Sequence, residues 1–185
     1  MTERTNPFYV LTLWYKPAQT MQGLIESGGG HRLALVVAML FGMVQADRFY
    51  LADPEAGITY YVMGALLGLV GLFLFGWLLR NFSRWFGGQA VVREVRVALG
   101  LGLLPWLCLF GALIFVLGAQ QDAAELANYY WLFFLGFLYG YVILLLSLAS
   151  ALRLSVLKTF LCLIVTALVS IFPLTLLIQL VSTVL

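Results

Sequence analysis

Long apolar stretches alternate with short polar segments along this chain. The apolar stretches cover about residues 33–51, 58–79, 97–118, 129–152 and 156–184. A helix needs roughly 20 consecutive apolar residues to cross the hydrocarbon core of a bilayer, and each stretch is close to that length or longer. The pattern predicts an all-α polytopic membrane protein, with five transmembrane helices in a single domain over residues 1–185.

Prolines interrupt two of these stretches. Pro105 lies in the interior of the third stretch and predicts a kink there, because proline removes a helical hydrogen bond. The fifth stretch contains Pro173 and is longer than a bilayer requires. It is expected to tilt, bend or project slightly beyond the outer surface.

Residues 1–32 are polar and aromatic and precede the first apolar stretch. Pro17 breaks any continuous helix here, whereas Trp14 and Tyr15 are side chains that settle at the level of lipid headgroups. We expect two short interfacial helices in this segment, ended by Gly28-Gly29-Gly30. Because the apolar run begins so far into the chain, no cleavable signal peptide is expected.

The connection between the second and third stretches mixes basic and aromatic residues. Arg80 and Arg84 are one helical turn apart, and Phe82 and Trp85 are interleaved with them. Such a mixture is typical of an amphipathic helix that lies on a membrane surface. We therefore predict an interfacial helix between spans two and three, broken by Gly87-Gly88.

The charges are sorted between alternate polar segments. Every basic residue except Arg48 lies in the segments before span one, between spans two and three, and between spans four and five. Basic residues are enriched in cytoplasmic loops, so the sorting predicts a cytoplasmic N-terminus and an outer C-terminus. With 63% apolar residues, 10% charged residues and a mean hydropathy of +1.03, the composition leaves no room for a separate soluble domain.

The predicted cytoplasmic face supplies the main candidate site. Basic and aromatic residues there could bind anionic lipid headgroups or an acidic partner, or could simply set the topology. The candidate residues are Arg80, Arg84, Trp85, Arg93 and Arg96. A second candidate is an intramembrane polar site formed by Gln45, Asp47 and Arg48, because charges in spans often mark ion or substrate paths. The other interpretation of Asp47 and Arg48 is a pair at the outer interface.

Catalytic and metal sites are not expected. His31 is the sole histidine and lies outside the spans, so helical metal motifs with two histidines cannot form. Cys108 and Cys162 fall inside predicted spans, where they behave as small apolar residues. No cofactor is implied, and nucleic acid is not expected as a partner because no basic soluble domain exists.

Small residues recur four positions apart in three spans. This spacing lets two helix backbones approach closely. Packing within one bundle is favoured over a homodimer face, because a bundle needs several such contacts. The pairs are Gly64 and Gly68, Ala98 and Gly102, and Gly136 and Gly140.

Several short features resemble the Yip domain family. Asn6-Pro7, Pro17, the Gly87-Gly88 pair and Pro105 about seventeen residues later are similar to the family's layout. The exit from span four, Ser147 through Ser155 to Lys158, is similar to the family's serine-then-lysine segment, although Thr159 stands where the family often has alanine. The resemblance covers nearly the whole chain and implies a five-span membrane domain without a catalytic motif.

The family takes its name from eukaryotic relatives that interact with Ypt/Rab GTPases and act in vesicle traffic. This chain looks like the bacterial branch, which resides in the inner membrane. The leading hypothesis is a non-enzymatic membrane protein that organises membrane, or scaffolds membrane and lipid partners, through its cytoplasmic face. Membrane lipids, other membrane proteins or a second copy are the expected partners. The alternative is a small-solute or ion transporter or channel that uses the helix bundle.

Overall fold

Helices form the whole of the regular structure in the part of the chain that the structure describes. The computed structural model describes residues 11–52, 57–119 and 129–184. Residues 1–10, which belong to the segment expected to form interfacial helices, lie outside these ranges. The helices are α2 (Pro17–Glu26), α3 (His31–Ala52), α4 (Ile58–Trp85), α5 (Val92–Gly102), α6 (Leu104–Ala119), α8 (Tyr130–Leu152) and α9 (Val156–Val184).

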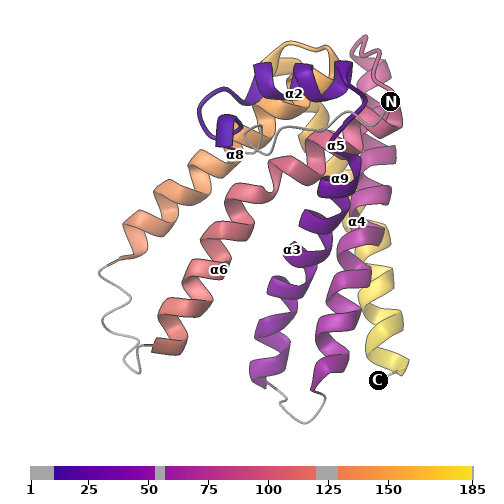
Figure 1. Cartoon of the computed structure of the whole chain (residues 1–185). Helices are drawn as coiled ribbons and strands as arrows, with labels where there is room; N and C mark the ends of the chain where they lie inside the picture. Colours follow the sequence, from indigo (N-terminus) through magenta and orange to yellow (C-terminus); the bar gives the residue numbers. More distant parts are fainter. Residues whose placement is uncertain (1–10, 53–56, 120–128, 185) are drawn as a thin grey trace.

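The long helices run up and down, and α2 lies across one end of the bundle (Figure 1). Helices α3, α5 and α9 begin at the same end at which α4 and α8 finish. We call this the basic end, because the described basic residues other than Arg48 gather there. They are Lys16, Arg32, Arg80, Arg84, Arg93, Arg96, Arg153 and Lys158.

Three helical segments among the described residues are long and apolar enough to cross a membrane. They are Ile58–Trp85, the bent segment Val92–Phe115, and Tyr130–Leu152. In α9 the segment Val156–Ile171 is also apolar but is shorter than these three. This agrees with a polytopic helical membrane protein. Five spans and the orientation of the chain stay predictions.

The predicted interfacial helix between spans two and three is wrong. Helix α4 continues without a break to Trp85, so Arg80 and Arg84 lie in its last turns and only a short connection leads to α5. The reason is packing, because Leu79, Phe82 and Ser83 continue the buried face of α4 beyond the expected end of the span. The chain turns at Gly87, where φ is +87° and a side chain would be strained.

The predicted kink at Pro105 is confirmed. The third span begins earlier than expected, at Val92, and Leu103 separates α5 from α6. Pro105 has no amide hydrogen to donate to the carbonyl four residues earlier, so the α-helical ladder is interrupted at this point. Two further breaks are confirmed, since Pro17 begins α2 and the backbone after α2 turns at Gly28 and Gly30, both with positive φ.

Helix α2 packs its apolar face onto the end of the bundle. Its buried residues follow the spacing of one helical face: Pro17, Thr20, Met21 and Leu24. This face contacts α8 and α5. The prediction that this segment forms a helix lying at the end of the spans therefore agrees with the structure, and the helix is seated on protein.

Small residues allow a very close helix–helix contact between α3 and α4. A Cβ added at Gly68 would lie 2.2 Å from the carbonyl oxygen of Ala38, and one added at Gly64 would lie 2.6 Å from that of Gly42. Gly102 faces Leu144 and Gly140 faces the Trp106 indole at similarly short range. The small residues predicted from their spacing are thus used within the bundle.

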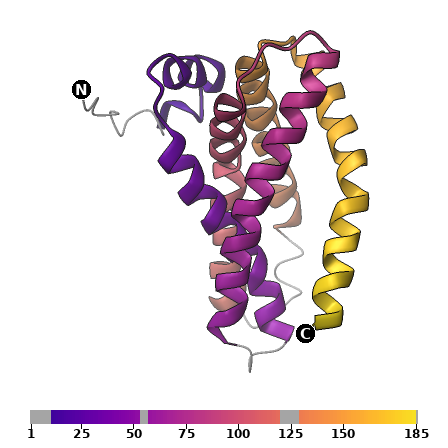
Figure 2. The same ribbon diagram turned by 90° about the vertical axis from the view of Figure 1, so that its right-hand side faces the viewer.

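The core is concentrated toward the basic end. Met21, Val95, Ala98, Leu148 and Leu152 come from α2, α5 and α8 and are fully buried there. Toward the opposite end α6 and α8 lean away from α3 and α4 (Figure 1), and α9 is close to α4 at the basic end but diverges from it further along (Figure 2). The basic end is therefore the best-packed part of the molecule.

Candidate functional site: the basic end of the bundle

The end of α4 presents two of the predicted site residues to solvent. Arg84 is exposed, and Trp85 is 74% exposed, with its ring packed edge-on against Phe82 at a centroid distance of 4.9 Å. This contact orients a large amphipathic ring without burying it. A tryptophan and an arginine side by side at a helix end suit the boundary between headgroups and acyl chains.

Arg80, one turn earlier, is more constrained. Its Nη1 donates a hydrogen bond to the Asn81 side-chain oxygen at 3.2 Å, and its Nε is buried without a hydrogen-bond partner in the described part of the chain. Arginine is always charged, and a guanidinium with one unmet donor gains from an anion or water that reaches it. Arg80 therefore places a second positive charge one helical turn before Arg84 on α4.

The two arginines of α5 act within the fold. Arg93 Nη2 donates to the Gly28 carbonyl oxygen at 3.0 Å and so ties the start of α5 to the turn after α2. The Arg96 side chain lies over Gly76, and its guanidinium carbon is 4.5 Å from the centroid of the Phe73 ring. This cation–π contact directs the charge along α4 instead of outward.

His31 lies beside these arginines at the first position of α3. Burial, and then the positive charges of Arg96 and Arg93, lower the pKa of His31 from its usual 6.5. Its Nδ1 is buried and has no hydrogen-bond partner in the described residues. The neutral imidazole is therefore favoured at neutral pH, because a further positive charge at this position would be repelled.

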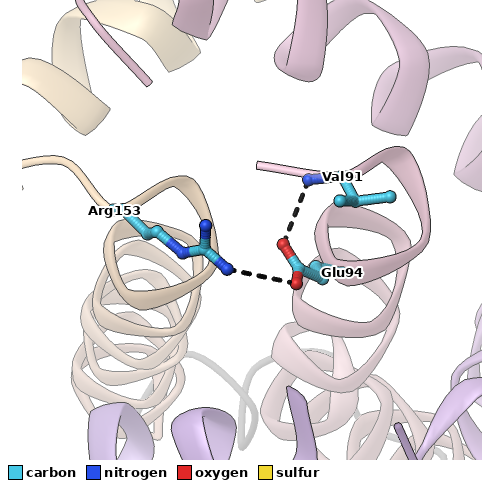
Figure 3. Close-up of polar contacts among 3 residues, drawn as sticks. All are labelled: Val91, Glu94 and Arg153. Atoms are coloured by element: carbon cyan, nitrogen blue, oxygen red, sulfur yellow. Dashed lines mark hydrogen bonds and ion pairs between the residues drawn. The ribbon is translucent and has the colours of Figure 1, made fainter. Parts of the chain in front are cut away.

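An ion pair joins the start of α5 to the end of α8 (Figure 3). Glu94 Oε2 accepts a hydrogen bond from the Val91 amide at 3.0 Å, and Glu94 Oε1 lies 3.4 Å from Arg153 Nη2. Glu94 thus caps the start of α5 through its side chain, where a negative charge interacts favourably with the helix dipole. The Arg153 backbone is left-handed, with φ of 56°, which non-glycine residues seldom adopt.

Sequence reasoning missed this pair. A capping box normally pairs Ser or Thr with Glu three residues later, and valine at position 91 cannot accept the reciprocal bond. Of the two residues that define a capping box in the sequence, only the glutamate at the third helical position is therefore present. No local pattern points from Glu94 to Arg153, which is 59 residues away.

The second candidate site lies at the opposite end, on α3 and α4. The Tyr61 hydroxyl donates to Asp47 Oδ1 at 2.9 Å, and Gln45 and Asp47 are both half-buried. The Arg48 side chain lies outside the described residues. The bond joins the neighbouring ends of α3 and α4, so this carboxylate serves at least to hold the two helices together.

The described residues contain no group of three or more His, Cys, Asp or Glu side chains that could hold a metal ion. Cys108 is exposed and Cys162 is buried, and both are free thiols.

The sequence matches one known protein family over most of its length. The Yip1 domain family matches residues 11–178, which is most of the chain. The chain belongs to the Yip1 domain family. No curated protein and no solved structure matches this Yip1 protein. The resemblance inferred from Pro17, Gly87-Gly88 and Pro105 is therefore confirmed, and with its apolar helices the Yip1 chain is an integral membrane protein.

Proposed function

We propose that this Yip1 protein is a non-enzymatic membrane protein that binds anionic lipid headgroups at its basic end and thereby organises the membrane around it. The observation that carries the proposal is the exposed Arg84 and Trp85 at the end of α4, on a face where basic residues gather. Each basic residue near an anionic membrane surface contributes about 1 kcal/mol to its attraction.

The charge balance of that end supports an anionic ligand. The described acids there are Glu26 and Glu94, and Glu94 is engaged with Arg153 and the α5 backbone. The remaining arginines differ in availability, because Arg93 and Arg96 are held against the fold whereas Arg84 is free to extend. Arg84 is thus the residue whose replacement reports on lipid contact rather than on folding.

We also propose an orientation for the chain in the membrane. The basic end faces the cytoplasm, because membrane proteins carry most of their lysines and arginines on the cytoplasmic side. In a bacterium, the membrane concerned is the inner membrane. An Arg84→Cys variant in which Cys108 and Cys162 are replaced by serine should, in intact cells, react with a membrane-impermeant maleimide only after the membrane is permeabilised. Labelling of intact cells would place this end outside.

The lipid contact is tested by native mass spectrometry of the full chain in mixed phosphatidylglycerol and phosphatidylcholine. Arg84→Gln should lower phosphatidylglycerol retention about fivefold, from about 1 kcal/mol per charge. Arg84→Lys keeps the charge and is the matched control, and raised salt should weaken binding to the parent chain. Equal retention by Arg84→Gln and Arg84→Lys contradicts the proposal.

A further inference from the structure

An open hollow of about 340 Å³ lies between α2 and the end of α8, where the chain turns into α9. It is separate from the Arg84 surface, and none of its residues belongs to the sites predicted from sequence. Pockets for small ligands start at roughly 300 Å³, so the hollow can hold a headgroup and the first part of a chain. It is lined by Ala18, Gln22, Leu146, Ala149, Ser150, Arg153, Leu154 and Val156.

The lining is divided into an apolar floor and a polar rim. Leu146, Ala149 and Leu154 provide aliphatic surface, whereas Gln22 and Arg153 bring an amide and a guanidinium. Ser150 fixes the wall between the two helices, because its hydroxyl donates to the Ala18 carbonyl oxygen at 3.2 Å. A ligand that matches this lining has an apolar part joined to a polar, charged part.

The floor continues along the lipid-facing side of α8. Leu146, Val142, Leu138 and Leu135 follow one another three or four residues apart and so lie on one helical face. Leu138, Val142 and Leu135 are all exposed. An acyl chain could therefore leave the hollow along this face, past the exposed ring of Tyr139, whose hydroxyl donates to the Trp14 carbonyl oxygen.

The charge of the rim favours a phosphate. Arg153 is 53% exposed, and only one of its terminal nitrogens contacts Glu94, while Figure 3 shows the other turned away from that carboxylate. Lys16 and Lys158 are exposed and lie two residues from the lining residues Ala18 and Val156. These three cations outnumber the two acids of this end, Glu94 and Glu26, which is one turn beyond Gln22 on α2, so an anionic headgroup fits better than a neutral one.

We propose that the hollow binds one anionic phospholipid, with its phosphate at Arg153 and one acyl chain along the Leu146–Val142–Leu138 face of α8. Lipid binding would also explain why an arginine is present at position 153, where the left-handed backbone would be less strained with glycine. The site binds a single lipid at a fixed position, and it does not depend on Arg84.

The test uses the full chain and a phosphatidylglycerol that carries a photoreactive diazirine in one acyl chain. Cross-links should map to α8 between Leu135 and Ser150, and native mass spectrometry of the Arg84→Gln variant should still retain one phosphatidylglycerol in preference to phosphatidylcholine. Soluble glycerol phosphate should not displace it, because the apolar floor contributes to binding. Displacement by glycerol phosphate, equal retention of phosphatidylcholine, or cross-links elsewhere overturns the proposal.

Two variants separate binding from a structural ion pair. Arg153→Gln should lower the α8 cross-link yield about fivefold. Glu94→Gln should raise it or leave it unchanged, because it removes the competing carboxylate. A purely structural pair predicts losses in both variants, and that result overturns the site. Arg32→Gln removes the same charge at the start of α3 and should leave the cross-link unchanged.

Filling the hollow provides a test that leaves charge unchanged. Ala149→Phe should abolish the α8 cross-link, and Ala18→Phe, from the opposite wall, should do so if Ala149→Phe fails to fold. A folded variant that still cross-links at full yield overturns the proposal. If phosphatidylglycerol retention is the same in Arg84→Gln and Arg84→Lys while these cross-links are intact, the proposed function alone is contradicted.

Discussion

The contact between α3 and α4 makes a sharp prediction at Gly42. A Cβ added there would lie 2.0 Å from the Gly64 carbonyl oxygen and 3.0 Å from the Gly68 Cα. Both atoms belong to the backbone, which cannot rotate away as a side chain can. Gly42→Ala therefore has to push the two helices apart along their closest contact.

The expected cost follows from two opposing effects. Overpacking a tight interior contact costs about 1–3 kcal/mol, and a backbone obstacle favours the upper value. Alanine gains about 1 kcal/mol over glycine in helix propensity. The net loss for Gly42→Ala is then about 2 kcal/mol. In a chain of this length that lowers Tm by roughly 4–8 °C.

Gly71 in α4 offers a matched control, because nothing lies within 4 Å of a Cβ added there. Gly71→Ala should gain only the propensity effect and raise Tm by roughly 2–4 °C. The assay is thermal unfolding of the purified chain in a mild detergent, followed by tryptophan fluorescence. If Gly42→Ala is as stable as Gly71→Ala, the proposed close packing of α3 on α4 is refuted.

Three further predictions concern polar groups. Tyr61→Phe should destabilise the chain by about 1 kcal/mol in thermal unfolding, because it deprives Asp47 of its donor, and an unchanged Tm would contradict that role. Since the folded-state pKa of His31 lies below 6.5, the unfolded chain binds more protons, so stability should fall as pH drops below about 6.5. His31→Gln should flatten this pH dependence of Tm, and an equally steep profile in the variant would assign it to another group. Arg153→Gly should keep or raise Tm, because relieving the strain of the left-handed backbone offsets the loss of a long, exposed ion pair. Phosphatidylglycerol retention should fall in the same variant. A lower Tm with unchanged retention would contradict both expectations.

Features with a local physical cause could be predicted from the sequence. Proline lacks an amide hydrogen, and the sequence therefore predicted the breaks at Pro17 and Pro105. Pro173 shows that the rule is not sufficient, because α9 continues through it from Val156 to Val184. The turns at Gly28 and Gly87 follow from the freedom of glycine to adopt positive φ. The helical character of the apolar stretches follows from the need to satisfy backbone hydrogen bonds in lipid.

The end of α4 shows where local reasoning fails. The basic and aromatic residues from Arg80 onward predicted a separate surface helix. In the structure Phe82 and Ser83 are buried, and α4 is continuous through them. The sequence also placed Arg84 and Arg96 in one candidate set. Only the fold separates them, because Arg96 lies over Phe73 whereas Arg84 points to solvent.

By itself, then, the sequence determined which segments are helical, where the chain must break, and how its charges are sorted along the chain. These follow from hydropathy, from proline and glycine geometry, and from the identity of each residue. The tertiary structure alone decided that Glu94 meets Arg153, that Arg96 is held against α4, and that an open hollow forms between α2 and the end of α8. Each of these depends on which helices become neighbours, and helices of similar apolar composition do not encode their neighbours in any local pattern.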